Sequence, residues 1–76
     1  MVREQAGELP MPSYYANRRS QSNGDNEVHT SKCRYFPKNA QYLGDFSTCQ
    51  PAIEAARRYY PRANGCATCC PECNTG

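Results

Sequence analysis

The sequence predicts an α+β fold, a small zinc-stabilised domain with two or three short β-strands, one helix and a C-terminal cysteine-rich knuckle. Three observations predict it. β-Favouring residues alternate with turn-forming residues in the first half of the chain. Residues 48–60 repeat apolar side chains at helical spacing, and four of the six cysteines lie within residues 66–73. The 76 residues make one domain, which we assign to residues 13–76 after a flexible leader at 1–12.

The strands are predicted from aromatic and β-branched residues between turn signals. Tyr14-Tyr15 begins a first strand, and Asn23-Gly24-Asp25 is a strong turn signal. A second strand over 27–29 therefore pairs with the first as a hairpin. A third strand covers residues 41–43 and ends at Gly44-Asp45.

The helix is predicted over about 48–60. Ser47 or Thr48 is a natural N-cap, and Pro51 favours Thr48 because proline is tolerated only in the first helical turn. Pro61 ends the helix at the residue before it. One face of the helix is apolar and consists of Cys49, Ala52, Ile53, Ala56 and Tyr60.

The apolar core is thin for a domain of this size. The chain has two Val, two Leu and one Ile, and of these only Val28, Leu43 and Ile53 fall in predicted elements. Six Tyr and two Phe add area, although a buried Tyr must also find a partner for its hydroxyl. Below about 70–80 residues a core alone seldom supplies more than ~3–5 kcal/mol. We therefore expect the cysteines to staple the chain.

Cysteines can staple a chain through a metal ion or through disulfides. The first residues hold no apolar run of signal-peptide length, and no stretch is suited to spanning a membrane. We therefore expect a cytoplasmic, reducing compartment, where clustered cysteines serve as metal ligands. A disulfide-stapled protein without metal is the alternative. Six free thiols in the denatured, metal-free protein would indicate the zinc model, and two or fewer a largely bridged chain.

Four residues form the predicted zinc site: His29-x3-Cys33 early in the chain and Cys66-x2-Cys69 late. A Cys-x2-Cys turn brings two sulfurs toward one point, and the second pair completes the tetrahedron of N and S ligands that structural zinc prefers. Asn64-Gly65 predicts a tight turn immediately before Cys66. Because a strand and a helix separate the two pairs, the ion would clamp distant parts of the chain and contribute to folding.

Three cysteines are left over. Cys70-x2-Cys73 overlaps the favoured pair, so Cys70 or Cys73 can replace a proposed ligand. Cys49 lies on the buried helix face, where we interpret it as a small core hydrophobe. A contact between Cys49 and Cys73, reduced or oxidised, is left open.

The order of these motifs carries a family resemblance. Its segments are Val28-His29-x3-Cys33, Tyr42–Phe46, Ala52–Ala56 and Gly65-Cys66-x2-Cys69. Over about residues 27–70 the chain resembles the N-terminal zinc-binding domain of Ada-type DNA alkylation-repair proteins and the Ada-like modules attached to nucleases. It is also similar to short bacterial proteins of unknown function that contain Ser-Asn-Gly-Asp-x-Glu-Val-His and Asn-Gly-Cys-x2-Cys. In the Ada repair domain a zinc-bound cysteine of the first pair accepts a methyl group, and His29 occupies that position here. A neutral imidazole is a poor methyl acceptor, so the resemblance implies the fold and the metal but not the repair reaction.

The sequence favours a binding module over an enzyme. Its carboxylates show no paired arrangement for acid–base work, and a zinc site with surplus ligands leaves no open position for catalysis. We expect a monomer that binds an unknown protein or a nucleic acid.

The nucleic-acid alternative rests on a basic surface formed by Arg18, Arg19, Arg57 and Arg58. In this alternative, nucleic-acid bases would stack on the rings of Tyr35, Tyr59 and Tyr60. The plainer interpretation is a solvated helix face with tyrosines filling a poor core, because the net charge of the chain is only +2.

Overall fold

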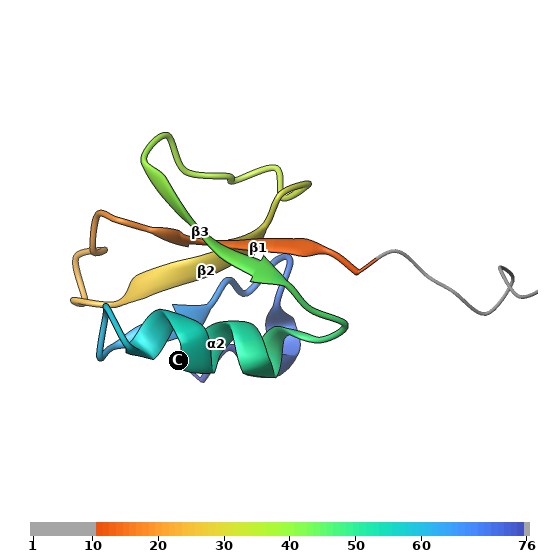
Figure 1. The fold of residues 1–76 in the computed structure, drawn as a ribbon. Coiled ribbons are helices and arrows are strands. Elements are labelled where there is room, and N and C mark those ends of the chain that lie inside the picture. Colours follow the sequence, from red (N-terminus) through yellow and green to blue (C-terminus); the bar gives the residue numbers. More distant parts are fainter. Residues whose placement is uncertain (1–10, 76) are drawn as a thin grey trace, which may run out of the picture.

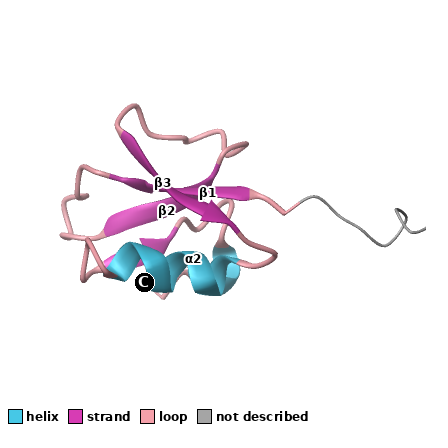
Figure 2. Ribbon diagram, viewed as in Figure 1, coloured by secondary structure: helices cyan, strands magenta, loops and turns pink. Residues whose placement is uncertain are grey.

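The computed structural model of the protein describes residues 11–75. In this range the chain forms a four-stranded mixed sheet and one α-helix (Figure 1, Figure 2), which confirms the predicted α+β fold. The elements in chain order are β1 (Ser13–Asn17), β2 (Asn26–Thr30), β3 (Ala40–Asp45), α2 (Cys49–Arg57), β4 (Ala63–Gly65) and the 3-10 helix η1 (Pro71–Cys73). The predicted leader at 1–12 lies mostly outside the described residues. The helices within residues 11–75 are too short or too polar to cross a lipid bilayer.

The strands lie in the order β3-β1-β2-β4. β1 pairs antiparallel with both β2 and β3, and β4 adds to β2 in parallel. The register places Tyr15 opposite His29 on one side and opposite Tyr42 on the other. Directly opposed residues share a face of the sheet, and neighbours along a strand point to opposite faces. One face therefore carries Tyr42, Tyr15 and His29, whereas Tyr14 and Ala16 point to the other.

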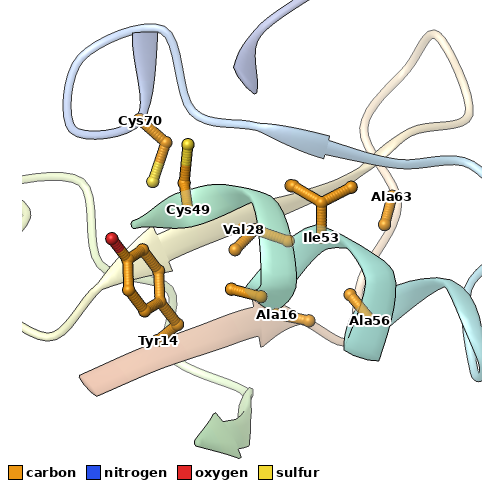
Figure 3. Packing of buried hydrophobic residues seen from close by; sticks show 9 residues of the cluster. Tyr14, Ala16, Val28, Cys49, Ile53, Ala56, Ala63 and Cys70 are labelled. Atoms are coloured by element: carbon orange, nitrogen blue, oxygen red, sulfur yellow. The ribbon is translucent and has the colours of Figure 1, made fainter. Parts of the chain in front are cut away.

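Helix α2 covers the Tyr14 face and contacts all four strands (Figure 1). The core between them is small, and Figure 3 shows most of its side chains. Val28 and Ile53 are the buried branched aliphatics, and Leu43 is only partly buried against the cluster. The other buried members are Tyr14, Ala16, Cys49, Ala52, Ala56, Ala63 and Cys70. The predicted shortage of apolar side chains is thus a property of the folded core, in which alanines take four of the nine buried positions.

The turn predicted at Asn64-Gly65 is wrong, because both residues lie in β4. They pair with Glu27 and Val28 of β2. Gly65 is required there for space: a Cβ would lie 2.8 Å from the backbone oxygen of Cys70 and 2.8 Å from the Cβ of Cys73. The glycine therefore permits close packing of the C-terminal segment, a need that a local turn rule does not detect.

The helix begins where it was predicted and ends earlier. Thr48 is the N-cap residue, with extended backbone, although its side chain makes no capping hydrogen bond. The α-helix ends at Arg57 instead of Tyr60. The backbone N–H groups of Arg58 and Tyr59 donate to the carbonyls of Ala55 and Ala56, three residues back. This tighter final turn brings the chain round into Pro61.

Candidate metal centre

The four predicted ligands, His29, Cys33, Cys66 and Cys69, lie together on the side of the sheet away from α2. One ligand atom from each lies within 4.8 Å of all the others. The side chains of His29, Cys33 and Cys66 are buried and that of Cys69 is partly buried. The chain thus has a compact His/Cys3 group that can hold a metal ion.

The spacing of these atoms fits one small ion. With bonds of about 2.3 Å to sulfur and about 2.0–2.1 Å to nitrogen, a tetrahedral zinc site has S–S edges of about 3.8 Å and N–S edges of about 3.5–3.6 Å. Nδ1 of His29 is 3.5 Å from Sγ of Cys33 and 3.9 Å from Sγ of Cys69. The sulfurs of Cys33 and Cys66 are 3.9 Å apart. At these three edges a tetrahedral ion requires adjustments of a few tenths of an ångström, and the other three edges are no longer than 4.8 Å.

His29 is positioned by β2 and by a carboxylate on the same strand. Its Nδ1 faces the cysteine sulfurs, whereas Nε2 is 3.2 Å from Oε1 of Glu27. Glu27 thereby favours the tautomer that carries its proton on Nε2 and leaves the Nδ1 lone pair for an ion. Burial lowers the pKa of His29, although the charge and hydrogen bond of Glu27 act in the opposite direction. The imidazole is thus kept in the neutral form that a metal requires.

Cys33 and Cys66 each sit at the start of a tight turn with the same local geometry. In both turns the backbone N–H two residues later donates to the cysteine sulfur, from Tyr35 to Cys33 and from Thr68 to Cys66, each at 3.4 Å. Cys69 receives the corresponding N–H from Thr30 of β2, also at 3.4 Å. Each sulfur therefore has a backbone donor directed at it, and such donors stabilise the negative charge of a thiolate.

Cys66 lies beside β2 because it directly follows β4, which pairs with β2. The N–H of Cys66 donates to the carbonyl of Val28, which extends the parallel pairing by one step. The N–H of Cys70 then donates to the carbonyl of Cys66 and closes the turn that contains Cys69. The two ligands of the C-terminal pair are thus attached to the same strand that carries His29.

The thiols of Cys33 and Cys69 are protonated as long as no ion replaces their protons. Burial raises the pKa of Cys33 and that of Cys69 to about 11, although backbone N–H groups from Tyr35 and Thr30 act in the opposite direction. A metal ion must displace these protons, so its binding depends on pH. Once the thiols are deprotonated, three thiolates and one imidazole form a soft, fully protein-derived ligand set.

The remaining cysteines lie on the core side of the C-terminal segment. Cys49 and Cys73 form a disulfide across 24 residues. Cys70 is a free thiol buried among core residues that include Tyr14 and Cys49 (Figure 3). Its sulfur is 3.8 Å from that of Cys69, but it does not belong to the group that includes His29. The structure therefore keeps Cys66 and Cys69 as the candidate ligands and leaves Cys70 and Cys73 out.

The disulfide changes two of the predictions. Cys49 is buried on the helix face as expected, but it is a covalent partner of Cys73 rather than only a small hydrophobe. The chain accordingly has four free thiols, so neither the predicted count of six nor the count of two or fewer describes it. One bridge anchors the start of α2 to η1, and the four side chains of the candidate metal centre remain separate from it.

Sequence reasoning missed the groups that support the ligands. Glu27 was assigned only to a strand, yet a carboxylate two residues before a strand histidine lies on the same face, and this spacing could have identified it. The three N–H donors have no residue-type signal, because they are backbone groups. The strand register alone brings Thr30 to Cys69.

The predicted basic surface is divided between two layers. Arg18 and Arg19 follow β1 and are exposed, whereas Arg57 and Arg58 lie at the end of α2. Nη2 of Arg57 donates to the carbonyl of Ala63 at 3.4 Å, which directs that side chain toward β4. Of the three tyrosines named above, Tyr60 packs partly buried against the core, whereas Tyr35 and Tyr59 are exposed. Tyr14 is the buried tyrosine of residues 11–75.

No family model, curated protein or solved structure matches this chain. The resemblance to the Ada-like zinc-binding domain therefore stays a prediction.

Proposed function

We propose that this protein is a small binding module whose fold is organised by one structural zinc ion. The observation that carries the proposal is the largely buried group of one imidazole nitrogen and three sulfurs, all within 4.8 Å of one another, with three of its six edges close to those of a tetrahedral site. His29, Cys33, Cys66 and Cys69 hold the ion. The role is structural, and the protein is not an enzyme.

Zinc suits this ligand set better than other common ions. Three thiolates and an imidazole form one of the usual structural zinc sites, and hard ions such as Mg²⁺ and Ca²⁺ require oxygen ligands. All four tetrahedral positions are taken by protein atoms, so no position is left for a water or a substrate. A closed site of this kind supplies stability rather than catalysis. An Ada-like origin of the module is consistent with the same ligand order.

The ion joins parts of the chain that the core connects only weakly. His29 lies in β2, Cys33 follows it, and Cys66 and Cys69 come after the short strand β4. The core contributes two buried branched aliphatics, Val28 and Ile53. Structural zinc in small finger domains contributes an apparent ~10–16 kcal/mol at neutral pH. That contribution exceeds what a core of this size supplies.

The disulfide and the metal ion would cross-link different parts of the chain, so the disulfide does not replace the ion. Cys49–Cys73 ties α2 to the C-terminal segment, on the core side of the sheet. The loop over residues 31–39, between β2 and β3, contains Cys33, which the bridge does not reach. The metal is the cross-link for that part of the molecule.

The proposal is tested by native mass spectrometry and by Co²⁺ titration of the full-length protein. We expect one zinc ion per chain after purification. Co²⁺ should replace it and give the intense visible bands of a four-coordinate site, with thiolate-to-cobalt charge transfer. A six-coordinate cobalt spectrum, or a folded protein that binds no ion, would contradict the proposal.

A further inference from the structure

An aromatic row lies on the face of the sheet that α2 leaves open. The ring of Tyr15 is the centre of this row, with Phe36 at 5.0 Å and Tyr42 at 5.3 Å between ring centroids. Tyr42 is 55% exposed and Phe36 is 39% exposed. We call Tyr15, Phe36 and Tyr42 the aromatic row. Its apolar surface faces outward, away from the core described above.

The row is held in place by neighbouring polar contacts. The hydroxyl of Tyr42 donates to Oδ1 of Asp45 at 2.7 Å, and the hydroxyl of Ser13 donates to the same oxygen. These bonds tie the hydroxyl of Tyr42 to the C-terminal residue of β3 and fix its ring. Preorganised rings lose little conformational entropy when a ligand stacks on them.

The candidate metal centre supports the same surface. The backbone N–H of Phe36 donates to the carbonyl of Cys33, and the N–H of Tyr35 donates to its sulfur. Tyr15 is directly opposite His29 in the sheet register. An ion at Cys33 and His29 therefore anchors both the loop that carries Phe36 and the strand next to Tyr15. The inference accordingly rests on the function proposed above.

Exposed cations lie in the chain segments next to the residues of the aromatic row. Arg18, Arg19, Arg34 and Lys38 are all exposed in the segments that adjoin it, and none forms an ion pair with a carboxylate of residues 11–75. Arg19 and Lys38 line one shallow hollow together with Asn17. Asn17 also lines a second hollow, which extends to Glu27, His29 and Thr68.

Acidic groups near this face are already engaged with protein partners. Glu27 contacts His29, Asp25 forms an ion pair with Arg62, and Asp45 accepts from Ser13 and Tyr42. Asp45 lies at the opposite end of β3 from Lys38, since its strand begins at Ala40. The hollow lined by Arg19 and Lys38 has no acidic side chain in its lining, so a polyanion can approach from that end.

We propose that this face binds a single-stranded nucleic acid. Bases stack on Tyr42 and Phe36, and phosphates contact Arg19 and Lys38. Proteins that bind single strands combine a cationic groove with exposed aromatic rings in this way. A duplex keeps its bases stacked on each other, so it would use the cations and leave the rings exposed. An acidic protein would use the cations but would not require flat rings.

The test is fluorescence anisotropy of a labelled oligothymidylate of about 12 nucleotides, titrated with the full-length, zinc-loaded protein at several salt concentrations. We expect binding that weakens as salt rises. Tyr42→Ala and Phe36→Ala should each weaken binding at least about fivefold, since stacking contributes ~1–3 kcal/mol per base. Tyr42→Phe keeps the ring but loses the hydroxyl that bonds Asp45, so it should weaken binding clearly less than Tyr42→Ala does.

Matched controls lie on the helix layer. Tyr59→Ala removes a ring that is 62% exposed outside the row, and it should leave the affinity unchanged. Arg19→Ala should weaken binding and reduce its salt dependence, whereas Arg58→Ala should do neither. The proposal would be overturned if Tyr59→Ala weakened oligonucleotide binding as much as Tyr42→Ala does. It would also be overturned if Arg58→Ala weakened binding as much as Arg19→Ala does.

Other occupants give different results. Equal affinity for a duplex, with no effect of Tyr42→Ala, would overturn the proposal. A dimer in sedimentation that Tyr42→Ala dissociates would overturn it as well, and would identify a second copy of the chain as the occupant. Co²⁺ spectra of the same samples separate the two proposals. A normal cobalt site without oligonucleotide binding overturns this inference alone, and a missing cobalt site overturns the zinc module and this inference together.

Discussion

Glu27 and His29 lie two residues apart on β2, and Oε1 of Glu27 is 3.2 Å from Nε2 of His29. The opposite ring nitrogen of His29 faces the sulfurs of Cys33 and Cys69. The carboxylate therefore orients the imidazole from behind, which is the usual arrangement of a metal-binding histidine and its outer partner. Glu27 is a positioning residue for the candidate metal centre.

Replacing Glu27 should weaken metal binding without removing a ligand. Glu27→Ala leaves Nε2 without its acceptor, and we expect metal affinity to fall about 10–100-fold. Competition with a chromophoric chelator measures it. Glu54→Ala, on the exposed surface of α2, is the control and should have no effect. Equal affinities for the two variants would show that Glu27 does not support the site.

The adjacent cysteines 69 and 70 should differ in their effect on the cobalt spectrum. Cys69→Ser removes a thiolate from the group around His29, so the sulfur-to-cobalt charge-transfer band should lose about a third of its intensity, one of three sulfurs. Cys70→Ser changes a buried core thiol instead and should keep the full band. It should lower the free energy of unfolding by about 1–3 kcal/mol, because it buries a hydroxyl. The reverse pattern would make Cys70 the ligand.

Metal binding should release protons. The pKa of Cys33 and that of Cys69 are about 11, so both thiols are protonated at neutral pH and must lose their protons when the ion binds. The pKa of His29 is lowered by burial, so the imidazole adds no proton above about pH 6.5. Apparent affinity should therefore rise with pH, by about 100-fold per pH unit from these two thiols. Calorimetry in buffers of different ionisation enthalpy counts the protons, and fewer than two would contradict these pKa values.

The thiol count should be four. Cys49 and Cys73 form a disulfide, and Cys33, Cys66, Cys69 and Cys70 are free. A thiol reagent applied to the denatured, chelated protein should react with four groups, and with six after reduction. Counts of six without reduction, or of two, would contradict the structure. Disulfides persist in oxidising compartments, so the same count on protein taken from its host tests the cytoplasmic localisation, which stays a prediction.

Loss of the bridge should weaken the fold without abolishing the metal site. The disulfide closes a loop of about 25 residues, which corresponds to about 3–4 kcal/mol in the chain-entropy model. The double variant Cys49→Ser/Cys73→Ser should lower the free energy of unfolding of the zinc-loaded protein by about that amount in urea. Its cobalt spectrum should be unchanged. A lost cobalt site would mean that the bridge, not the ion, positions the C-terminal pair.

Much of the fold could be predicted because its signals are local. The hairpin follows from Asn23-Gly24-Asp25 between two β-favouring runs, and the N-cap of α2 follows from the position of Pro51. Spacing alone identified His29, Cys33 and two overlapping C-terminal pairs as candidate ligands. The choice of Cys66 and Cys69 over Cys70 and Cys73 rested on a turn at Asn64-Gly65. The structure places the chosen pair in the His/Cys3 group, although Asn64 and Gly65 lie in β4.

The features that escaped prediction depend on contacts between distant segments. β4 is only three residues long and exists because β2 offers it a parallel edge. Gly65 looks like a turn residue, yet it is required because Cys70 and Cys73 pack against its backbone. The pairing of Cys49 with Cys73 could be suspected but not assigned, since spacing does not choose among disulfide partners.

The most direct test of the central claim is circular dichroism of the full-length protein before and after chelation, under reducing conditions. We predict that the zinc-loaded form is folded and that removal of the ion, confirmed by native mass spectrometry, abolishes its tertiary structure, which returns when Zn²⁺ is added. A protein that keeps its native spectrum with every metal ion removed and its thiols reduced would contradict the account.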